Sequence, residues 1–265
     1  MGEKKLTERQ IGNLKFNLIK FFEYFLYVCR RLYKFTLMHL PSKSSKAAAK
    51  VNVSYFTTIP TSDISEHLSF LYLYLCSAKP LNILELGTRG GESTKVFEKY
   101  CSEMNIIGHS IDLNAEPKWL ADSKFWRHFV GDDISLGQKI NETKKWPNGD
   151  VFHELDFIFI DTSHLYTHTM QEIQTYMPLL KKGVGTLAFH DSNLLFKPTR
   201  RLDGKINLGW NNQRGVARAI QEYFNFKFRE DTLQVQLIAN QKFVFYHQPW
   251  CNGFSLLAPY HGISD

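Results

Sequence analysis

The sequence predicts an α/β domain with a Rossmann-like, doubly wound and mostly parallel seven-stranded sheet, whose last strand is antiparallel, preceded by an N-terminal helical extension. Two short apolar runs, Phe157–Ile160 and Thr186–Phe189, each end abruptly on polar residues, which is typical of buried parallel strands. A helical pattern, Thr167–Leu180, separates them, and strands that alternate with helices at this spacing predict right-handed crossovers. Ligands bind beyond the carboxyl ends of such strands, so the site is expected there.

The composition is that of an ordinary globular protein. The 265 residues are 43% hydrophobic and 22% charged, and the chain is long enough for one large domain with an appendage. The net charge of +6 only weakly favours anionic partners, because much of the excess lies in Lys4–Lys50. The four cysteines show no C-x-x-C spacing, which indicates reduced thiols and a cytoplasmic location. No run of eighteen uncharged apolar residues occurs, so we expect no transmembrane span.

The N-terminal fifth of the chain differs from the rest. Residues 7–40 are predicted to be helical, because apolar and aromatic side chains recur every three or four positions with basic residues between them. Two interpretations stay open for this helix: homo-oligomer or intramolecular packing, and peripheral contact with an anionic membrane surface. A polar linker, Pro41–Lys50, follows. We therefore predict an extension in residues 1–50 and the α/β domain in residues 51–265.

The remaining elements follow in regular order. A helix capped by Ser62–Ser65 is expected to run to about Ala78, and Pro80 ends it. Parallel strands are expected at Leu81–Leu86, Ile106–Ile111, Phe129–Val130, Leu155–Ile160 and Thr186–Phe189, and a closing hairpin at Leu233–Ala239 and Lys242–His247. The other helices are expected at Thr94–Tyr100, Thr167–Leu180 and Gly215–Phe224.

A glycine-dense turn, Gly87 to Gly91, follows the first strand. Glycine lets the backbone turn sharply and approach a ligand, and the next helix offers free N–H groups. The turn departs from G-x-G-x-x-G, which argues against a hydride-transfer dinucleotide site. Acids close the first three strands: Glu85, Asp112 and Asp132. An acid at the second strand end is placed to accept both ribose hydroxyls, and one before the loop to face an ammonium, so the pattern suits S-adenosylmethionine.

The motifs as a set resemble a known family. Residues 80–247 resemble the class I S-adenosylmethionine-dependent methyltransferases. They are similar to a narrower group within it, the metal-dependent O-methyltransferases of sugar and macrolide tailoring and the related proteins labelled cephalosporin hydroxylase. The resemblance is carried by Phe157–Tyr166, Pro178–Gly183, His190-Asp191 and Arg214–Ile220. It implies methyl transfer to a hydroxyl of a small molecule, with a sugar or glycoconjugate as the expected acceptor.

The resemblance also implies roles for residues. In those relatives the acid matching Asp161 binds magnesium with an acidic pair at the fifth strand end, and the histidine three residues later is the general base. By position it implies the metal ligands Asp161, His190 and Asp191, and catalytic roles for His164 and Asp161. Relatives usually carry an acid where this chain has His190, and imidazole suits transition metals better than magnesium, so the identity of the ion stays open. The implied cofactor contacts are Glu85, Gly87, Thr88, Arg89, Gly91, Ser93, Asp112, Asp132 and Asp161.

Other interpretations are open. An acid after a strand is also a common turn residue, and a lone histidine is often a satisfied polar group. One alternative is metal-independent methylation of a small polar acceptor, with His164 or His190 as base. Another is a non-catalytic methyltransferase-like protein that binds the nucleoside or a membrane. We expect no nucleic acid partner, because the basic residues are not interleaved with aromatic ones on one strand face.

Overall fold

The computed structural model describes residues 64–194, 199–200, 206–207, 214–240 and 242–260. The predicted N-terminal helix, the linker and the start of the Ser62–Ser65 cap lie outside these residues. Within them, no helix combines the length and apolar character needed to cross a membrane.

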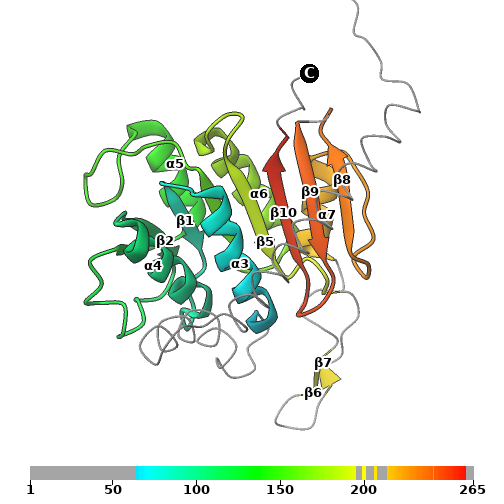
Figure 1. The fold of residues 1–265 in the computed structure, drawn as a ribbon, viewed down its shortest axis with the longest axis horizontal. Coiled ribbons are helices and arrows are strands. Elements are labelled where there is room, and N and C mark those ends of the chain that lie inside the picture. Colours follow the sequence, from blue (N-terminus) through cyan, green and yellow to red (C-terminus); the bar gives the residue numbers. More distant parts are fainter. Residues whose placement is uncertain (1–63, 195–198, 201–205, 208–213, 241, 261–265) are drawn as a thin grey trace, which may run out of the picture. The chain divides into compact units, whose positions relative to one another are not determined.

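One eight-stranded sheet forms the centre of the domain, in the order β3-β2-β1-β4-β5-β10-β9-β8 (Figure 1). Its strands are β1 (Ile83–Leu86), β2 (Gly108–Asp112), β3 (Trp126–Val130), β4 (Phe157–Ile160), β5 (Thr186–His190), β8 (Gln234–Ile238), β9 (Phe243–Gln248) and β10 (Phe254–Pro259). The first five pair in parallel, whereas β10 runs antiparallel to both of its neighbours. The predicted doubly wound, mostly parallel sheet with an antiparallel last strand is thus confirmed. A separate two-stranded ribbon joins β6 (Thr199–Arg200) to β7 (Ile206–Asn207).

The prediction of seven strands was one short. The unpredicted strand is β10, which lies between β5 and β9. Its first four residues are all buried, so the strand shows no alternation of polar and apolar residues that would mark it in the sequence. The predicted closing hairpin is confirmed as β8–β9, and β10 moves it outward to the edge of the sheet.

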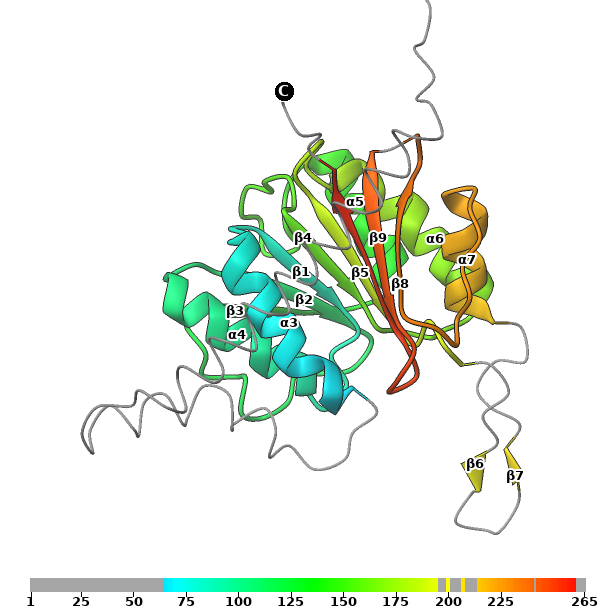
Figure 2. The same cartoon turned by 45° about the vertical axis from the view of Figure 1, so that its right-hand side comes forward.

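Helices cover both faces of the sheet (Figures 1 and 2). On one face α3 (Ser65–Ala78) packs against α4 (Glu92–Met104), and on the other α5 (Asp133–Thr143), α6 (Tyr166–Tyr176) and α7 (Gly215–Tyr223) contact one another in turn. Helix α4 is longer than predicted, and α5 was not predicted, because its sequence carries only a weak apolar stripe. Helix α6 ends four residues early, where Pro178 lies in a 3₁₀ turn, Met177–Leu179.

The register of the strands brings the predicted site residues to one edge. Leu86 of β1 lies opposite Ile111 of β2 and Ile160 of β4, and Ile160 lies opposite Phe189 of β5. All four side chains are buried and anchor the strand ends in the core. The residues that follow them, Gly87, Asp112, Asp161 and His190, therefore leave the sheet side by side.

Candidate active site

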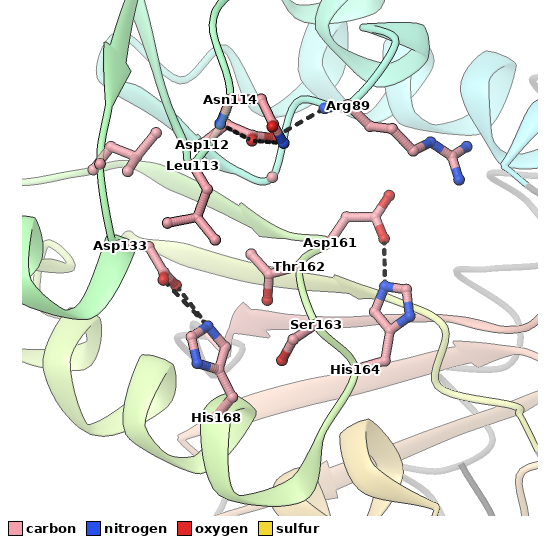
Figure 3. Close-up of a pocket in the computed structure, with 13 residues that line it drawn as sticks. Arg89, Asp112, Leu113, Asn114, Asp133, Asp161, Thr162, Ser163, His164 and His168 are labelled. Carbon is pink, nitrogen blue, oxygen red and sulfur yellow. Dashed lines mark hydrogen bonds and ion pairs between the residues drawn. The ribbon is translucent and has the colours of Figure 1, made fainter. Parts of the chain in front are cut away.

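A pocket with a volume of about 330 Å³ opens at the carboxyl ends of β1, β2 and β4 (Figure 3). In Figure 3, Asp133 and His168 face it from one side, and Asp161 and His164 from the other. The described residues that line it are Gly87, Arg89, Ile111, Asp112, Leu113, Asn114, Gly131, Asp133, Asp161, Thr162, Ser163, His164 and His168. Predicted cofactor and catalytic residues thus share its wall.

Gly87 is required by the contact between two turns. Its φ angle is +85°, and a Cβ placed on it would lie 2.1 Å from the carbonyl oxygen of Asp161. Its own N–H donates to the carbonyl of Ile111 at 2.9 Å. Any side chain here would push the turns after β1 and β4 apart, so only glycine fits.

Asp112 orders the glycine-rich loop. Its Oδ2 accepts the backbone N–H group of Thr88 at 2.6 Å. Oδ2 also accepts the N–H of Arg89 at 3.0 Å, and Oδ1 accepts that of Asn114 at 2.8 Å (Figure 3). Burial alone would raise the pKa of Asp112, but the amides of Arg89, Asn114 and Thr88 outweigh it and lower that pKa. A carboxylate accepts about four hydrogen bonds, and the side-chain Nδ2 of Asn114 supplies the fourth at 3.1 Å, so a ligand hydroxyl would have to replace that side-chain amide.

Five other predicted cofactor residues do not line the pocket within the described part of the chain. Glu85 is fully buried and accepts the hydroxyls of Ser93 at 2.5 Å and Thr94 at 2.6 Å, which ties β1 to the first turn of α4. Burial raises the pKa of Glu85 to about 8, so the carboxyl is largely protonated near neutral pH. Thr88 and Gly91 shape the loop. The backbone N–H of Thr88 donates to Asp112, and Gly91, with a left-handed backbone, is the N-cap of α4.

Asp132, the fifth, is exposed and caps α5 by accepting the N–H of Ser135 at 2.8 Å. The pocket instead takes its neighbours Gly131 and Asp133. Asp132 and Asp133 follow the same strand, and only the start of α5 decides which of the two faces the pocket.

The sequence did not predict the cluster Asp133, His168 and Glu172. Nε2 of His168 lies 3.2 Å from Asp133 and 3.8 Å from Glu172, and the hydroxyl of Thr162 donates to Glu172 at 2.6 Å. Burial raises the pKa of Glu172 to about 8. His168 and Glu172 are four residues apart on α6. That spacing places both side chains on one face of the helix, and it could have predicted the pair from the sequence.

The predicted metal ligands and base come together beside the pocket. Nε2 of His164 lies 3.1 Å from Oδ1 of Asp161 and 2.9 Å from Oδ2 of Asp191. Nδ1 of His190 lies 3.3 Å and 3.2 Å from the same two oxygens. Two carboxylates and two imidazoles thus converge, and ligand atoms of Asp161, His190 and Asp191 all lie within 4.8 Å of one another.

The electrostatics of the cluster favour charge. Burial would lower the pKa of His164, but its hydrogen bonds to Asp161 and Asp191 raise it to about 10. The same two carboxylates raise the pKa of the fully buried His190 well above its usual value, and the pKa values of the carboxyls fall in turn. The cluster therefore attracts a proton or another cation.

His190 passes a test of fit for a metal ion. Its Nε2 lies 3.1 Å from the carbonyl oxygen of Cys251, which can only accept, so Nε2 carries a hydrogen and Nδ1 points at the carboxylates. Among the described residues, Nδ1 of His190 and Oδ1 of Asp191 have no hydrogen-bond partner of good geometry, although both side chains are almost fully buried. A cation bound at Nδ1 of His190 would give that buried atom a partner.

Backbone strain marks the same place. His164 has a φ angle of +59° and Asp191 one of +56°, in the left-handed region that non-glycine residues rarely adopt. Each such residue costs roughly 1–3 kcal/mol and persists where the surrounding structure holds a functional geometry. Both belong to the four-residue cluster.

The chain is similar to known methyltransferases. Residues 84–192 match the family model of a methyltransferase domain. Among solved structures, a protein provisionally assigned as a caffeoyl-CoA O-methyltransferase from Staphylococcus aureus is 18% identical, with a TM-score of 0.50 over 87% of this chain and 98% of that one. TomG, an O-methyltransferase of tomaymycin synthesis from Streptomyces achromogenes solved with S-adenosylmethionine, is 16% identical, with a TM-score of 0.49 over 86% and 95%.

The mycinamycin-pathway methyltransferase MycE, solved with magnesium, S-adenosylhomocysteine and mycinamycin VI, is 12% identical, with a TM-score of 0.49 over 80% of this chain and 53% of MycE. No curated protein matches the chain. The likeness to the staphylococcal protein shows a shared fold.

Proposed function

We propose that this chain, whose residues 84–192 match a methyltransferase domain, is an S-adenosylmethionine-dependent O-methyltransferase that acts on a hydroxyl of a small molecule. The predicted resemblance to class I methyltransferases is confirmed by the family match and the fold. The observation that carries the proposal is that Gly87, Asp112 and Asp161, from three different strand ends, line one pocket.

The pocket has the chemistry that the cofactor needs. Ionised Asp112 would accept the ribose hydroxyls in place of the side-chain amide of Asn114 while it holds the loop amides. The glycine at position 87 allows close approach of the backbone. Leu113, Asp133 and His168 form the side of the pocket away from Asp161, which suits the flat base. The sulfonium methyl would then point toward the Asp161 side, where the acceptor hydroxyl must lie for in-line displacement.

A divalent ion fits the second half of the site. Asp161, His190 and Asp191 would hold it, and a bound ion lowers the pKa of a hydroxyl and orients it. His164 is the proposed base. While its Nε2 contacts both carboxylates, its pKa of about 10 keeps the imidazole protonated, so it accepts a proton only when those carboxylates are engaged elsewhere. The acceptor, a sugar or glycoconjugate, rests on the sequence resemblance.

Calorimetric titration of the full chain tests the cofactor assignment. We expect S-adenosylmethionine and S-adenosylhomocysteine to bind, and loss of binding in Asp112→Ala. Formation of S-adenosylhomocysteine is then followed with a panel of hydroxylated sugars, with and without added divalent ions. A folded chain that binds neither nucleoside would refute the proposal.

Metal-independent transfer is the second candidate, because the two histidines already neutralise the carboxylate pair without an ion. Activity that survives exhaustive chelation would favour it. Activity lost on chelation and restored by a single added ion would favour the metal-dependent form.

A further inference from the structure

We propose that the Asp161–His190–Asp191 site is built for a divalent transition metal rather than for magnesium, with Nδ1 of His190 as a ligand. This inference rests on the proposed function only in that it concerns the same site.

The tautomer of His190 is fixed by the backbone. The carbonyl oxygen of Cys251, 3.1 Å from Nε2, requires a hydrogen there, which leaves the lone pair of the neutral ring on Nδ1. A hydrogen bond from the far ring nitrogen to a carbonyl is the usual support of a metal-binding histidine. Nδ1 then faces Oδ1 of Asp161 and Oδ2 of Asp191.

The carbonyl of Cys251 is itself held from two sides. It belongs to residues 249–253, here called the Cys251 turn. From α3, the fully buried His67 donates through Nε2 to the carbonyl of Trp250 at 2.9 Å, with that of Cys251 at 3.3 Å. From the strand end after β5, Nδ2 of Asn193 donates to the carbonyl of Pro249 at 2.5 Å. The direction in which Nδ1 of His190 points is thus set before any ion binds.

The Cys251 turn is also packed too closely to shift. A Cβ on Gly253, whose φ angle is +89°, would lie 2.4 Å from the backbone nitrogen of Asn193. The ring of His67 meets that of His190 edge to face, with centroids 5.6 Å apart. These contacts hold the imidazole in place, and such pre-organisation favours a ligand role over a flexible polar contact.

The donor set discriminates between ions. Mg²⁺ takes oxygen ligands in near-octahedral geometry, whereas imidazole nitrogen suits Fe²⁺, Co²⁺ and Zn²⁺. A neutral imidazole in place of a third carboxylate also removes one negative charge from the site. This loss weakens the binding of a hard ion most. Nδ1 of His190, which has no hydrogen-bond partner of good geometry among the described residues, is the nitrogen that faces this space.

Metal-stripped full-length protein, titrated with Co²⁺ alone and with Mg²⁺ alone, tests the selectivity. Most protein sites bind Co²⁺ more tightly than Mg²⁺, so the diagnostic quantity is the change in that preference on substitution. We expect His190→Asp to lower the ratio of Co²⁺ to Mg²⁺ affinity at least about tenfold, the scale of losing a well-supported ligand. His153→Gln, which removes an exposed imidazole, is the matched control and should leave the ratio unchanged. An unchanged ratio in His190→Asp would overturn the proposal.

Proton NMR of the Co²⁺ protein supplies a readout that does not depend on activity. With Co²⁺ on Nδ1, the Nε2–H of His190 should give one strongly shifted exchangeable resonance, protected by its bond to Cys251. A resonance that persists in His190→Asp and vanishes in His164→Gln would assign the ligand to His164 and overturn the proposal. Wild-type protein that does not bind Co²⁺ would overturn it too. The cluster would then be stabilised by ion pairs between protonated histidines and the two carboxylates.

Titration of the same preparations with S-adenosylhomocysteine in the absence of metal separates the two proposals. Protein that binds Co²⁺ through His190 but not the nucleoside would refute the proposed function and leave the metal assignment standing. Protein that binds the nucleoside but shows no His190-dependent Co²⁺ binding would refute the metal assignment and leave the proposed function standing.

Discussion

The backbone of Gly87 lies directly against the carbonyl of Asp161, so close that a Cβ on the glycine would be 2.1 Å from the carbonyl oxygen. The turn that would bind the nucleoside and the strand end that carries a proposed metal ligand are therefore in contact through their main chains. A change on either side is transmitted to the other without any side chain between them.

Substitution of Gly87 by alanine tests this contact. Gly87→Ala should reduce the affinity for S-adenosylhomocysteine by roughly a hundredfold or more and destabilise the fold by about 2–4 kcal/mol, because the methyl group clashes and the φ angle of +85° is strained. Calorimetry and urea denaturation measure the two effects. Gly183→Ala is the control, since Gly183 also has a positive φ, +72°, but nothing lies within 4 Å of its Cβ position. It should lose about 1 kcal/mol of stability and keep full nucleoside affinity; equal affinity losses would contradict the role of the contact.

The two acids that follow neighbouring strands should behave differently. Asp112→Ala leaves two loop amides without their acceptor, and we expect at least a tenfold loss of nucleoside affinity, since each charge-assisted hydrogen bond is worth about 1.5–3 kcal/mol. Asp132→Ala removes only the cap of α5, so it should lower stability by about 1 kcal/mol and leave affinity unchanged. Equilibrium dialysis with labelled cofactor compares the pair, and equal losses of affinity would restore Asp132 as a cofactor contact.

His168 gives a kinetic prediction. It lines the pocket on the side opposite Asp161 and interacts with Asp133 and Glu172, so His168→Gln should raise the KM for the cofactor several-fold. The value of kcat at saturating cofactor should stay within about twofold, because the residue is not among the groups beside the reacting hydroxyl. His153→Gln controls for the loss of an imidazole. A fall in kcat without a change in KM would place His168 in the chemistry instead.

The parts of the fold that the sequence predicted share a physical cause. Strands such as β4 are buried on both faces, so they appear as continuous apolar runs, and the polar residue after each run marks the strand end. Parallel register then places Gly87, Asp112 and Asp161 together without further information. That is why these pocket residues were predictable although α5 and β10 were not.

The parts that were missed depend on contacts that leave no local pattern. Asp132 and Asp133 are chemically identical neighbours, and the start of α5 decides which one enters the pocket. The carbonyl that fixes His190 lies 61 residues further along the chain, at Cys251, and every residue type has a carbonyl. Glu85 was predicted as a ligand contact because it closes the predicted first strand. In the structure its carboxyl is buried and accepts the hydroxyls of Ser93 and Thr94, which ties β1 to α4.

The pH dependence of stability tests the assignment of Glu85 as that anchor. Its pKa of about 8 in the folded state exceeds the ordinary value of 4.5, so the folded protein keeps a proton that the unfolded chain releases. This contribution to stability is full below pH 4.5, falls by about 1.4 kcal/mol per pH unit between 4.5 and 8, and is lost above 8. Glu85→Gln resembles the protonated acid, so it should flatten the slope in that window and keep nucleoside affinity within about threefold.

Urea denaturation at pH 5, 6, 7 and 8 measures the slope in wild type and variant. Glu154→Gln, at an exposed carboxyl, should show the wild-type slope. Glu172, whose pKa burial also raises to about 8, gives a second contribution of the same sign, so Glu85→Gln should reduce the slope without abolishing it. A slope that Glu85→Gln leaves unchanged would mean that Glu85 is ionised in the folded protein and faces a cation. The ammonium of the cofactor would then be the first candidate, and the cofactor contact first predicted for Glu85 would return.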